Sequence, residues 1–248
     1  MELNGGRWVS PNALTAVQAA IKSTGYAANR HARSLVTGRA NSVAFLLTEP
    51  HQLLFEDPNF SVLLRGAADA LAQRDIPLLL MTAGTPAERR RVTDYVTAGH
   101  VDGVLVISSH ADDPMVAALL REKIPVVACG LPLGYEGRVG YVAADDVAGA
   151  REMVRHLRDT GRRQIATITG PLDTPGGVLR LKGYRDELGS AYDDDSWLAA
   201  TLTPALTTMR QPFERITTAM VSLLEEIVSG QQPAAIILPT ALVRRDST

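Results

Sequence analysis

The stretch that decides the fold runs from Ser42 to Thr82, where two apolar segments flank an amphipathic one. SVAFLLT (42–48) and IPLLLMT (76–82) are short continuous apolar runs, which are typical of strands buried on both faces. Between them, NFSVLLRGAADALAQRD (59–75) carries apolar residues at helical spacing, namely Phe60, Leu63, Leu64, Ala67, Ala68 and Leu71. The stretch therefore predicts a strand–helix–strand unit of a parallel sheet.

The alternation continues to about residue 189. Thr85 and Pro86 suit the start of the next helix, and Gly99 suits its end. Further apolar runs predict strands in VDGVLVISS (101–109), IPVVACG (124–130) and QIATITG (164–170). Amphipathic segments predict helices in TPAERRRVTDYVTAG (85–99), DPMVAALLREK (113–123), VAADDVAGAREMVRHLRDTG (142–161) and GGVLRLKGYRDELG (176–189). This order favours an α/β fold with helices on both faces of a parallel sheet.

The alternation stops over GSAYDDDSWLAATLTPALTTMRQP (189–212), where no clear strand occurs although one is due. A long predicted helix (212–230) and an apolar run (234–248) complete the chain. The second half thus offers only two or three strands, which are few for a sheet of its own.

The charges are unevenly distributed. The 248 residues carry a net charge of −2, but residues 1–39 hold five basic residues against one acidic residue, so the remainder carries −6. A basic arm on an acidic body predicts an anionic partner, nucleic acid first, with an ordinary solvated end as the alternative.

Cys129 is the only cysteine and follows an apolar run, so we interpret it as a core residue. No apolar run reaches the roughly 18 residues of a membrane span, and no signal-peptide pattern opens the chain. We therefore expect a cytoplasmic protein without a membrane partner.

The segment NRHARSLVTGR (29–39) has the pattern of one short helix. Asn29 suits the N-cap and Gly38 suits the C-terminal position. Isolated helices below about 12–15 residues are marginal in water, so this helix needs a partner to be ordered. A basic linker is the alternative.

In their order along the chain, these motifs resemble the lactose-repressor (LacI/GalR) family of bacterial transcription regulators. The resemblance rests on LNGGRWVSPNALTAVQAAIKSTGYAANRHARSLVTGR (3–39), on DPNFSVLLRGAADAL, VDGVLVISS, GRRQIATITGP and RLKGYRDEL, and above all on LTPALTTMRQP followed by LPTALVRRDST. It implies an α/β fold with type I periplasmic-binding-protein-like parallel-sheet subdomains behind a partial all-α DNA-binding headpiece and a hinge helix.

The resemblance also implies a division into domains. Residues 1–28 would be a remnant of the helix-turn-helix headpiece, with one helix capped by Ser10 and a buried face at Val17 and Ile21. Residues 29–39 would be the hinge helix, and 40–248 the effector-binding and dimerisation domain. Its N-terminal subdomain would comprise about 41–144 and 202–230, and its C-terminal subdomain about 145–201 and 232–248.

The chain departs from the family pattern in two places. It opens at MELNG, where the family's recognition helix is already ending, so we expect weak operator binding with little sequence preference. Between RLKGYRDELGSAYD (180–193) and DDSWLAATLTPALTT (194–208) the middle of the family's C-terminal subdomain is absent, so we expect that subdomain to be incomplete, with partial disorder over 165–201.

The implied DNA contacts lie in the hinge helix. Leu35 matches a leucine that the family wedges between base pairs in the minor groove, and Ala32 would let the helix lie close. The polar side chains would contact phosphate or sugar. The predicted DNA-binding residues are Asn29, Arg30, Ala32, Arg33, Ser34 and Leu35. The alternative is that Leu35 only packs on Val36 or on the body.

The resemblance implies an effector site between the subdomains, and it points to three residues. Phe60 would form an apolar wall, Arg180 would grip a sugar or a similar polar ligand with its planar set of donors, and Asp194 would accept hydrogen bonds. A solvated acidic loop is the alternative for Asp194. Gly130 stands where an aspartate is common in the family, which removes one expected polar contact.

Enzymes form the other class of function to consider. The chain has no GxGxxG after a strand, no P-loop, no GxSxG and no HExxH, and its five histidines are scattered. HADD (110–113) is interpreted as an Asp-rich turn rather than a metal cluster. We therefore predict no catalysis, cofactor or metal, and instead a homodimeric DNA-binding transcriptional regulator of the repressor kind, controlled by a small-molecule effector. The alternative is a stand-alone small-molecule-binding module that no longer binds operator DNA specifically.

Overall fold

The computed structural model describes residues 10–24, 39–187 and 206–247. The chain divides into two compact units, residues 1–40 and 41–248. In the first unit, helix α1 (Pro11–Thr24) begins where the sequence predicted. The Ser10 hydroxyl accepts a hydrogen bond from the Ala13 N–H at 3.3 Å, which caps the helix. Val17 and Ile21 are only half-buried, so the expected buried face of this helix is not covered.

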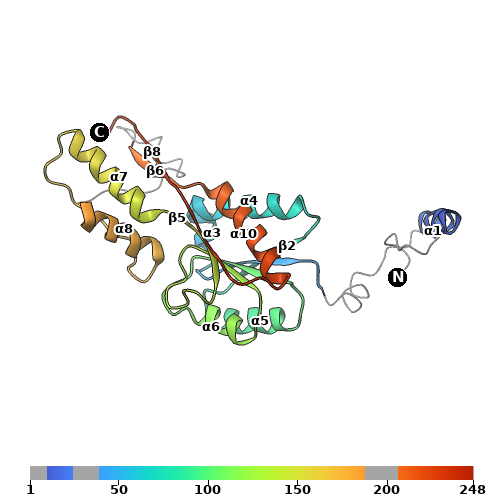
Figure 1. Cartoon of the computed structure of the whole chain (residues 1–248). Coiled ribbons are helices and arrows are strands. Elements are labelled where there is room, and N and C mark those ends of the chain that lie inside the picture. The colour runs from blue at the N-terminus through green and yellow to red at the C-terminus, as the bar shows by residue number, and fades with distance from the viewer. Residues whose placement is uncertain (1–9, 25–38, 188–205, 248) are drawn as a thin grey trace. The chain divides into compact units, whose positions relative to one another are not determined.

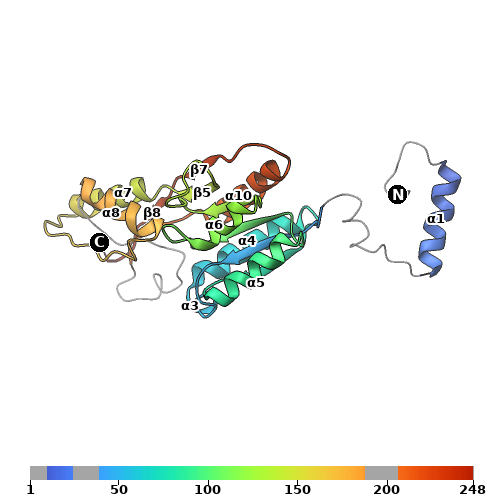
Figure 2. The same cartoon turned by 90° about the horizontal axis from the view of Figure 1, so that it is seen from below.

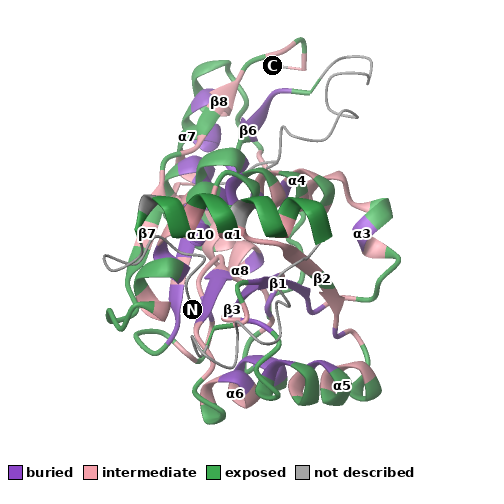
Figure 3. Ribbon diagram, turned by 90° about the vertical axis from the view of Figure 1, so that its right-hand side faces the viewer, coloured by how far each residue is buried: buried purple, intermediate pink, exposed green. Residues whose placement is uncertain are grey.

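The second unit is built around a six-stranded sheet with the order β2-β1-β3-β4-β5-β7, in which all pairs are parallel. Its strands are β1 (Val43–Leu47), β2 (Leu78–Thr82), β3 (Gly103–Ile107), β4 (Val126–Cys129), β5 (Gly140–Ala144) and β7 (Ala235–Leu238). Strands β1 and β3 each have a strand on both sides, and every residue of both is buried (Figure 3).

Helices cover both faces of this sheet (Figure 1). Helices α3 (Leu53–Glu56), α4 (Pro58–Ala72) and α10 (Phe213–Val228) pack on one face, and α5 (Pro86–Thr97) and α6 (Pro114–Arg121) pack on the other. The side chains of β1 alternate accordingly. Val43, Phe45 and Leu47 join the core with α4 and α10, whereas Ala44 and Leu46 join the core with α5 and α6. We call this part of the unit the first lobe.

The local signals of the sequence act as predicted in α5. Thr85 and Glu88 form a capping box, in which the Thr85 hydroxyl accepts from the Glu88 N–H and the Glu88 carboxylate accepts from the Thr85 N–H. Gly99 follows the helix with a φ of +77°, a left-handed conformation that costs glycine little. The helix therefore begins and ends at residues suited to those positions.

A smaller group of elements, which we call the second lobe, contains α7 (Asp146–Asp159), α8 (Pro175–Glu187), β6 (Thr208–Arg210) and β8 (Ala241–Val243). Figures 1 and 2 show them grouped together. The two helices pack closely, because a Cβ added at Gly183 would lie 2.5 Å from the Val147 carbonyl oxygen. Ion pairs Arg155–Glu187 and Arg151–Asp186 also join them. The strands β6 and β8 form an antiparallel pair.

The second lobe differs from the prediction in two respects. Residues 164–170 are not a strand, and Ile168 is fully exposed. A strand needs neighbouring strands to satisfy its backbone groups, and no strand pairs with this segment in the described part of the chain. The lobe therefore contains an antiparallel pair in place of the expected parallel sheet.

The division between lobes also differs from the expected boundaries. The expected division assigned 202–230 to the first subdomain and 232–248 to the second. Instead, β6 pairs with β8 and contacts α7, whereas β7 pairs with β5 and extends the six-stranded sheet. Strand pairing thus assigns β6 to the second lobe and β7 to the first. Helix α10, which lies between these two strands in the sequence, packs on the first lobe.

Candidate functional site

The strand order places a topological switch point between β1 and β3. The chain moves from β1 outward to β2 on one side and then returns to β3 on the other. In open parallel sheets, ligands bind outside the carboxyl ends of the strands at such a point. The residues that follow β1 and β3 are therefore the first candidates for a functional site.

Polar side chains gather at these two strand ends. The Ser108 hydroxyl donates to Glu49 Oε1 at 2.8 Å, and the Thr48 hydroxyl donates to the Ser108 carbonyl oxygen. Ser108 has a φ of +60°, which is uncommon for a residue other than glycine and tends to occur at functional sites. His110 Nε2 lies 2.7 Å from the same Glu49 oxygen. The two strands thus present one connected polar group.

The second lobe reaches this group through Asp173, in the segment before α8. His110 Nδ1 lies 2.8 Å from Asp173 Oδ2, and the Ala111 N–H donates to the Asp173 carbonyl oxygen at 2.6 Å. Asp113, in the same loop, caps α6 by accepting from the Met115 N–H at 2.8 Å, as the interpretation of HADD as a turn requires. The loop after β3 therefore contacts both lobes.

The titratable groups of this cluster influence one another. Burial alone would lower the pKa of His110, but the hydrogen bonds to Asp173 and Glu49 and the charges of these two groups outweigh it and raise that pKa above its ordinary value of 6.5. The hydrogen bond from His110 in turn lowers the pKa of Asp173. Both effects favour a protonated imidazole between two carboxylates.

Arg180, which the sequence predicted as an effector contact, lies on α8 and faces α7. Its Nε is 3.0 Å from Asp146 Oδ1, and the Asp146 carboxylate is only 10% exposed. The neighbouring Asp145 caps α7 by accepting from the Ala148 N–H. Arg180 is thus held by a fixed carboxylate while about a third of its side chain stays accessible. A guanidinium and carboxylates in one place can donate to and accept from the hydroxyl groups of a neutral polar ligand.

The other predicted site residues are placed as follows. Phe60 is in the first turns of α4, half-buried, and packs against the core of the first lobe. Asp194 and the predicted DNA-binding residues lie outside the described residues; the latter are Asn29, Arg30, Ala32, Arg33, Ser34 and Leu35. The structure therefore places two of the three predicted effector contacts and brings neither of them into hydrogen-bond contact with His110.

Gly130 has a structural reason to be glycine. Its φ is +90°, and a Cβ at this position would lie 3.2 Å from Pro175 Cγ at the start of α8. An aspartate here would be strained by the backbone conformation and would crowd the second lobe. In this chain the position is occupied by close packing against the start of α8.

The sequence interpretation missed Glu49 and Asp173 as members of this cluster and Asp146 as the partner of Arg180, and it treated His110 only as part of a turn. A usable signal was present, because Glu49 and His110 each follow a buried strand within three residues. Asp173 carried no such signal, because it meets His110 only through the packing of residues 63 positions apart.

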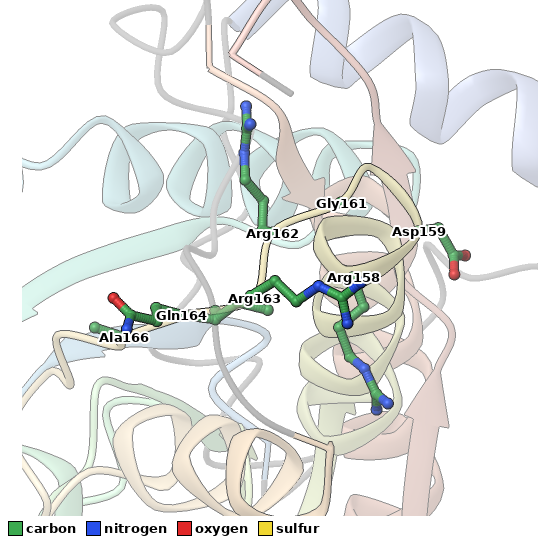
Figure 4. Close-up of a pocket in the computed structure, with 8 residues that line it drawn as sticks. Arg158, Asp159, Gly161, Arg162, Arg163, Gln164 and Ala166 are labelled. Carbon is green, nitrogen blue, oxygen red and sulfur yellow. The ribbon is translucent and has the colours of Figure 1, made fainter.

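A separate hollow of about 970 Å³ lies beyond the end of α7, next to the segment expected as a strand. Its lining residues are Arg158, Asp159, Gly161, Arg162, Arg163, Gln164, Ile165 and Ala166. Figure 4 shows Arg162 pointing away from Arg158 and Arg163. Because the cationic groups diverge, we do not assign a ligand to this hollow.

Comparison with known proteins agrees with this architecture. The HTH-type transcriptional regulator CelR of Thermobifida fusca is 40% identical over 219 residues, which cover 86% of this chain and 64% of CelR. A solved structure of a transcriptional regulator CelR–cellobiose complex matches with a TM-score of 0.80 and 30% identity, covering 99% of this chain and 93% of that one. The chain belongs to the LacI family.

The LacI-family relatives also define how far the comparison extends. The ribose operon repressor of Escherichia coli (strain K12) is 30% identical over 185 residues, which cover 74% of this chain and 54% of the repressor. The chain therefore spans between about half and two thirds of the length of these relatives.

Residues 188–248 match the model of a periplasmic binding protein-like domain, and the predicted α/β, periplasmic-binding-protein-like fold class is confirmed. The relatives are transcriptional regulators rather than enzymes. Among the described residues, no helix is long and apolar enough to cross a bilayer.

Proposed function

We propose that this LacI-family protein is a DNA-binding transcriptional repressor whose state is set by a small polar effector at the switch point of the first lobe. The observation that carries the proposal is the meeting of the two lobes at the carboxyl ends of β1 and β3, where Glu49, His110 and Asp173 form one cluster. A ligand that binds there touches both lobes and can shift the balance between their arrangements. We place this action in the cytoplasm, where the operator DNA is.

The chemistry of the cluster favours a neutral, hydroxyl-rich effector. Carboxylates outnumber basic groups in the contacts of the proposed site residues, with Glu49 and Asp173 around His110 and Asp146 against Arg180. An anionic ligand would be repelled by this set, whereas hydroxyl groups can both donate to carboxylates and accept from the guanidinium. The relative solved with cellobiose is consistent with a sugar of this kind. Phe60, Arg180 and Asp194 remain the proposed effector contacts.

The proposed DNA contact is the basic segment 29–39, with Leu35 as a minor-groove wedge. Two hinge helices are needed to support each other, so we propose that a homodimer binds a palindromic site. Residues 1–39 carry the net positive charge that phosphate contacts require.

The test is fluorescence anisotropy of labelled duplexes across a range of salt concentrations. Palindromes from the DNA that flanks the gene are compared with scrambled duplexes, with and without cellobiose as the probe effector. We expect DNA affinity to fall steeply with salt, to decrease in Leu35→Ala, and to change when cellobiose is added. Binding of cellobiose without measurable binding of any duplex at low salt would instead support the stand-alone binding module.

A further inference from the structure

His110 joins the two lobes through one imidazole ring. Its Nε2 is 2.7 Å from Glu49 at the end of β1, and its Nδ1 is 2.8 Å from Asp173 in the segment before α8. The adjacent Ala111 N–H donates to the Asp173 carbonyl oxygen at 2.6 Å. We propose that His110 is a pH-sensitive clasp, which holds the second lobe against the switch point when the imidazole is protonated.

The geometry favours the charged form. A neutral imidazole carries one N–H and one lone pair, so it can donate to only one of two acceptors. Glu49 and Asp173 lie at hydrogen-bond distance from the two different ring nitrogens. On loss of the proton, one nitrogen lone pair would face a carboxylate oxygen, and that contact would become repulsive. Both contacts are favourable together only in the imidazolium.

The surrounding charges support the same assignment. The carboxylates of Glu49 and Asp173 act on the imidazole, and Glu49 Oε1, which contacts His110, also accepts from the Ser108 hydroxyl. Asp112 and Asp113 of the same loop lie near Tyr135, where they add to burial in raising the pKa of that hydroxyl. The clasp therefore depends on the protonation of one imidazole ring that contacts both lobes.

The direction of the pH dependence follows from the raised pKa of His110. A group whose pKa is raised in the joined state contributes its full stabilisation below its ordinary pKa, 6.5, and loses it as the pH rises through the raised value. Mild acidity should therefore favour the joined lobes, and alkaline pH should release them. This device needs no effector, so it goes beyond the proposed function and can be tested separately from it.

The experiment measures amide hydrogen exchange of the full chain without ligand, at about pH 6 and about pH 8.5, with rates corrected for the intrinsic exchange at each pH. The reporter is the Ala111 amide, which donates across the lobes. The internal control is the next amide, Asp112, which donates to the Leu133 carbonyl oxygen within the first lobe at 3.2 Å. We expect the protection of Ala111 to fall severalfold at the higher pH while that of Asp112 stays unchanged.

Two variants separate the clasp from general stability. His110→Gln and Asp173→Asn should both lower the protection of Ala111 at the lower pH and remove most of its pH dependence. The Asp173 side chain is 58% exposed, so its replacement should leave the fold intact. His100→Gln is the matched control, since His100 precedes β3 at the opposite end of the strand and contacts Tyr95. Equal protection of Ala111 at both pH values, or unchanged pH dependence in His110→Gln, would overturn the proposal.

Discussion

At the scale of single residues, Arg180 is the side chain on which the proposed effector site depends most. Its guanidinium is held by Asp146 and is still partly accessible, so it is oriented before any ligand arrives. Arg180→Ala should weaken cellobiose binding by about 1.5–3 kcal/mol, the typical loss for hydrogen bonds to a charged group. Isothermal titration calorimetry measures this loss directly. Arg185→Ala, on an exposed position of the same helix, is the control and should bind like the unaltered protein. Equal affinity of both variants would remove Arg180 from the site.

Residues also differ in how well their roles could be predicted. Ser10, Thr85 and Gly99 act through neighbours a few positions away, so their capping roles follow from local sequence. The partner of His110 lies 63 residues along the chain, and only the packing of two lobes brings them together. Arg180 was predicted by resemblance, whereas its fixed partner Asp146 was not, because that pairing depends on the packing of α7 against α8.

At the scale of elements, the sequence predicted most strands of the six-stranded sheet, in which each strand pairs with at least one other. Segments 42–48, 76–82, 101–109 and 124–130 contain β1 to β4, whereas β5 was not predicted as a strand, because its last residues open the segment 142–161 in which a helix was expected. The segment 164–170 has the composition of a strand, but strand formation requires pairing that the described chain does not supply there. The local sequence pattern gives a segment its propensity to form a strand, and the strands available for pairing decide whether the strand forms.

This segment leads to a prediction about stability. Ile168 is fully exposed, so Ile168→Asp removes no packing and should change the melting temperature little. It should also reduce aggregation, because an exposed apolar side chain on an unpaired segment invites association. Thermal melting and light scattering at high concentration check the two parts. Ile107→Asp, at a buried position of β3, is the contrast and should prevent folding. A large loss of melting temperature in Ile168→Asp would mean that the segment is paired in solution.

At the scale of the whole molecule, the outer strand β2 is the surface at which we expect a second copy of the chain to bind. Among the described strands it pairs only with β1, and its sequence LLLMT leaves Leu80 45% exposed. An apolar edge of this kind is rarely left uncovered. Leu80→Lys should therefore shift the proposed dimer toward monomer in sedimentation analysis. Ile237→Lys alters the outer strand β7 on the opposite edge, where the side chain is 58% exposed, and the comparison of the two variants tells which edge contacts the second copy. A monomer at micromolar concentration in the unaltered protein would contradict the dimer.

The connections between the lobes have a mechanical consequence. The chain passes between them at Asp145, at residues 211–212 and at residues 239–240, each time within one or two residues. Because each connection is so short, any change in the angle between the lobes must be taken up by backbone rotation at these few residues. The His110 ring contacts both lobes, so a proton on it acts on the angle between two bodies and not on one side chain alone.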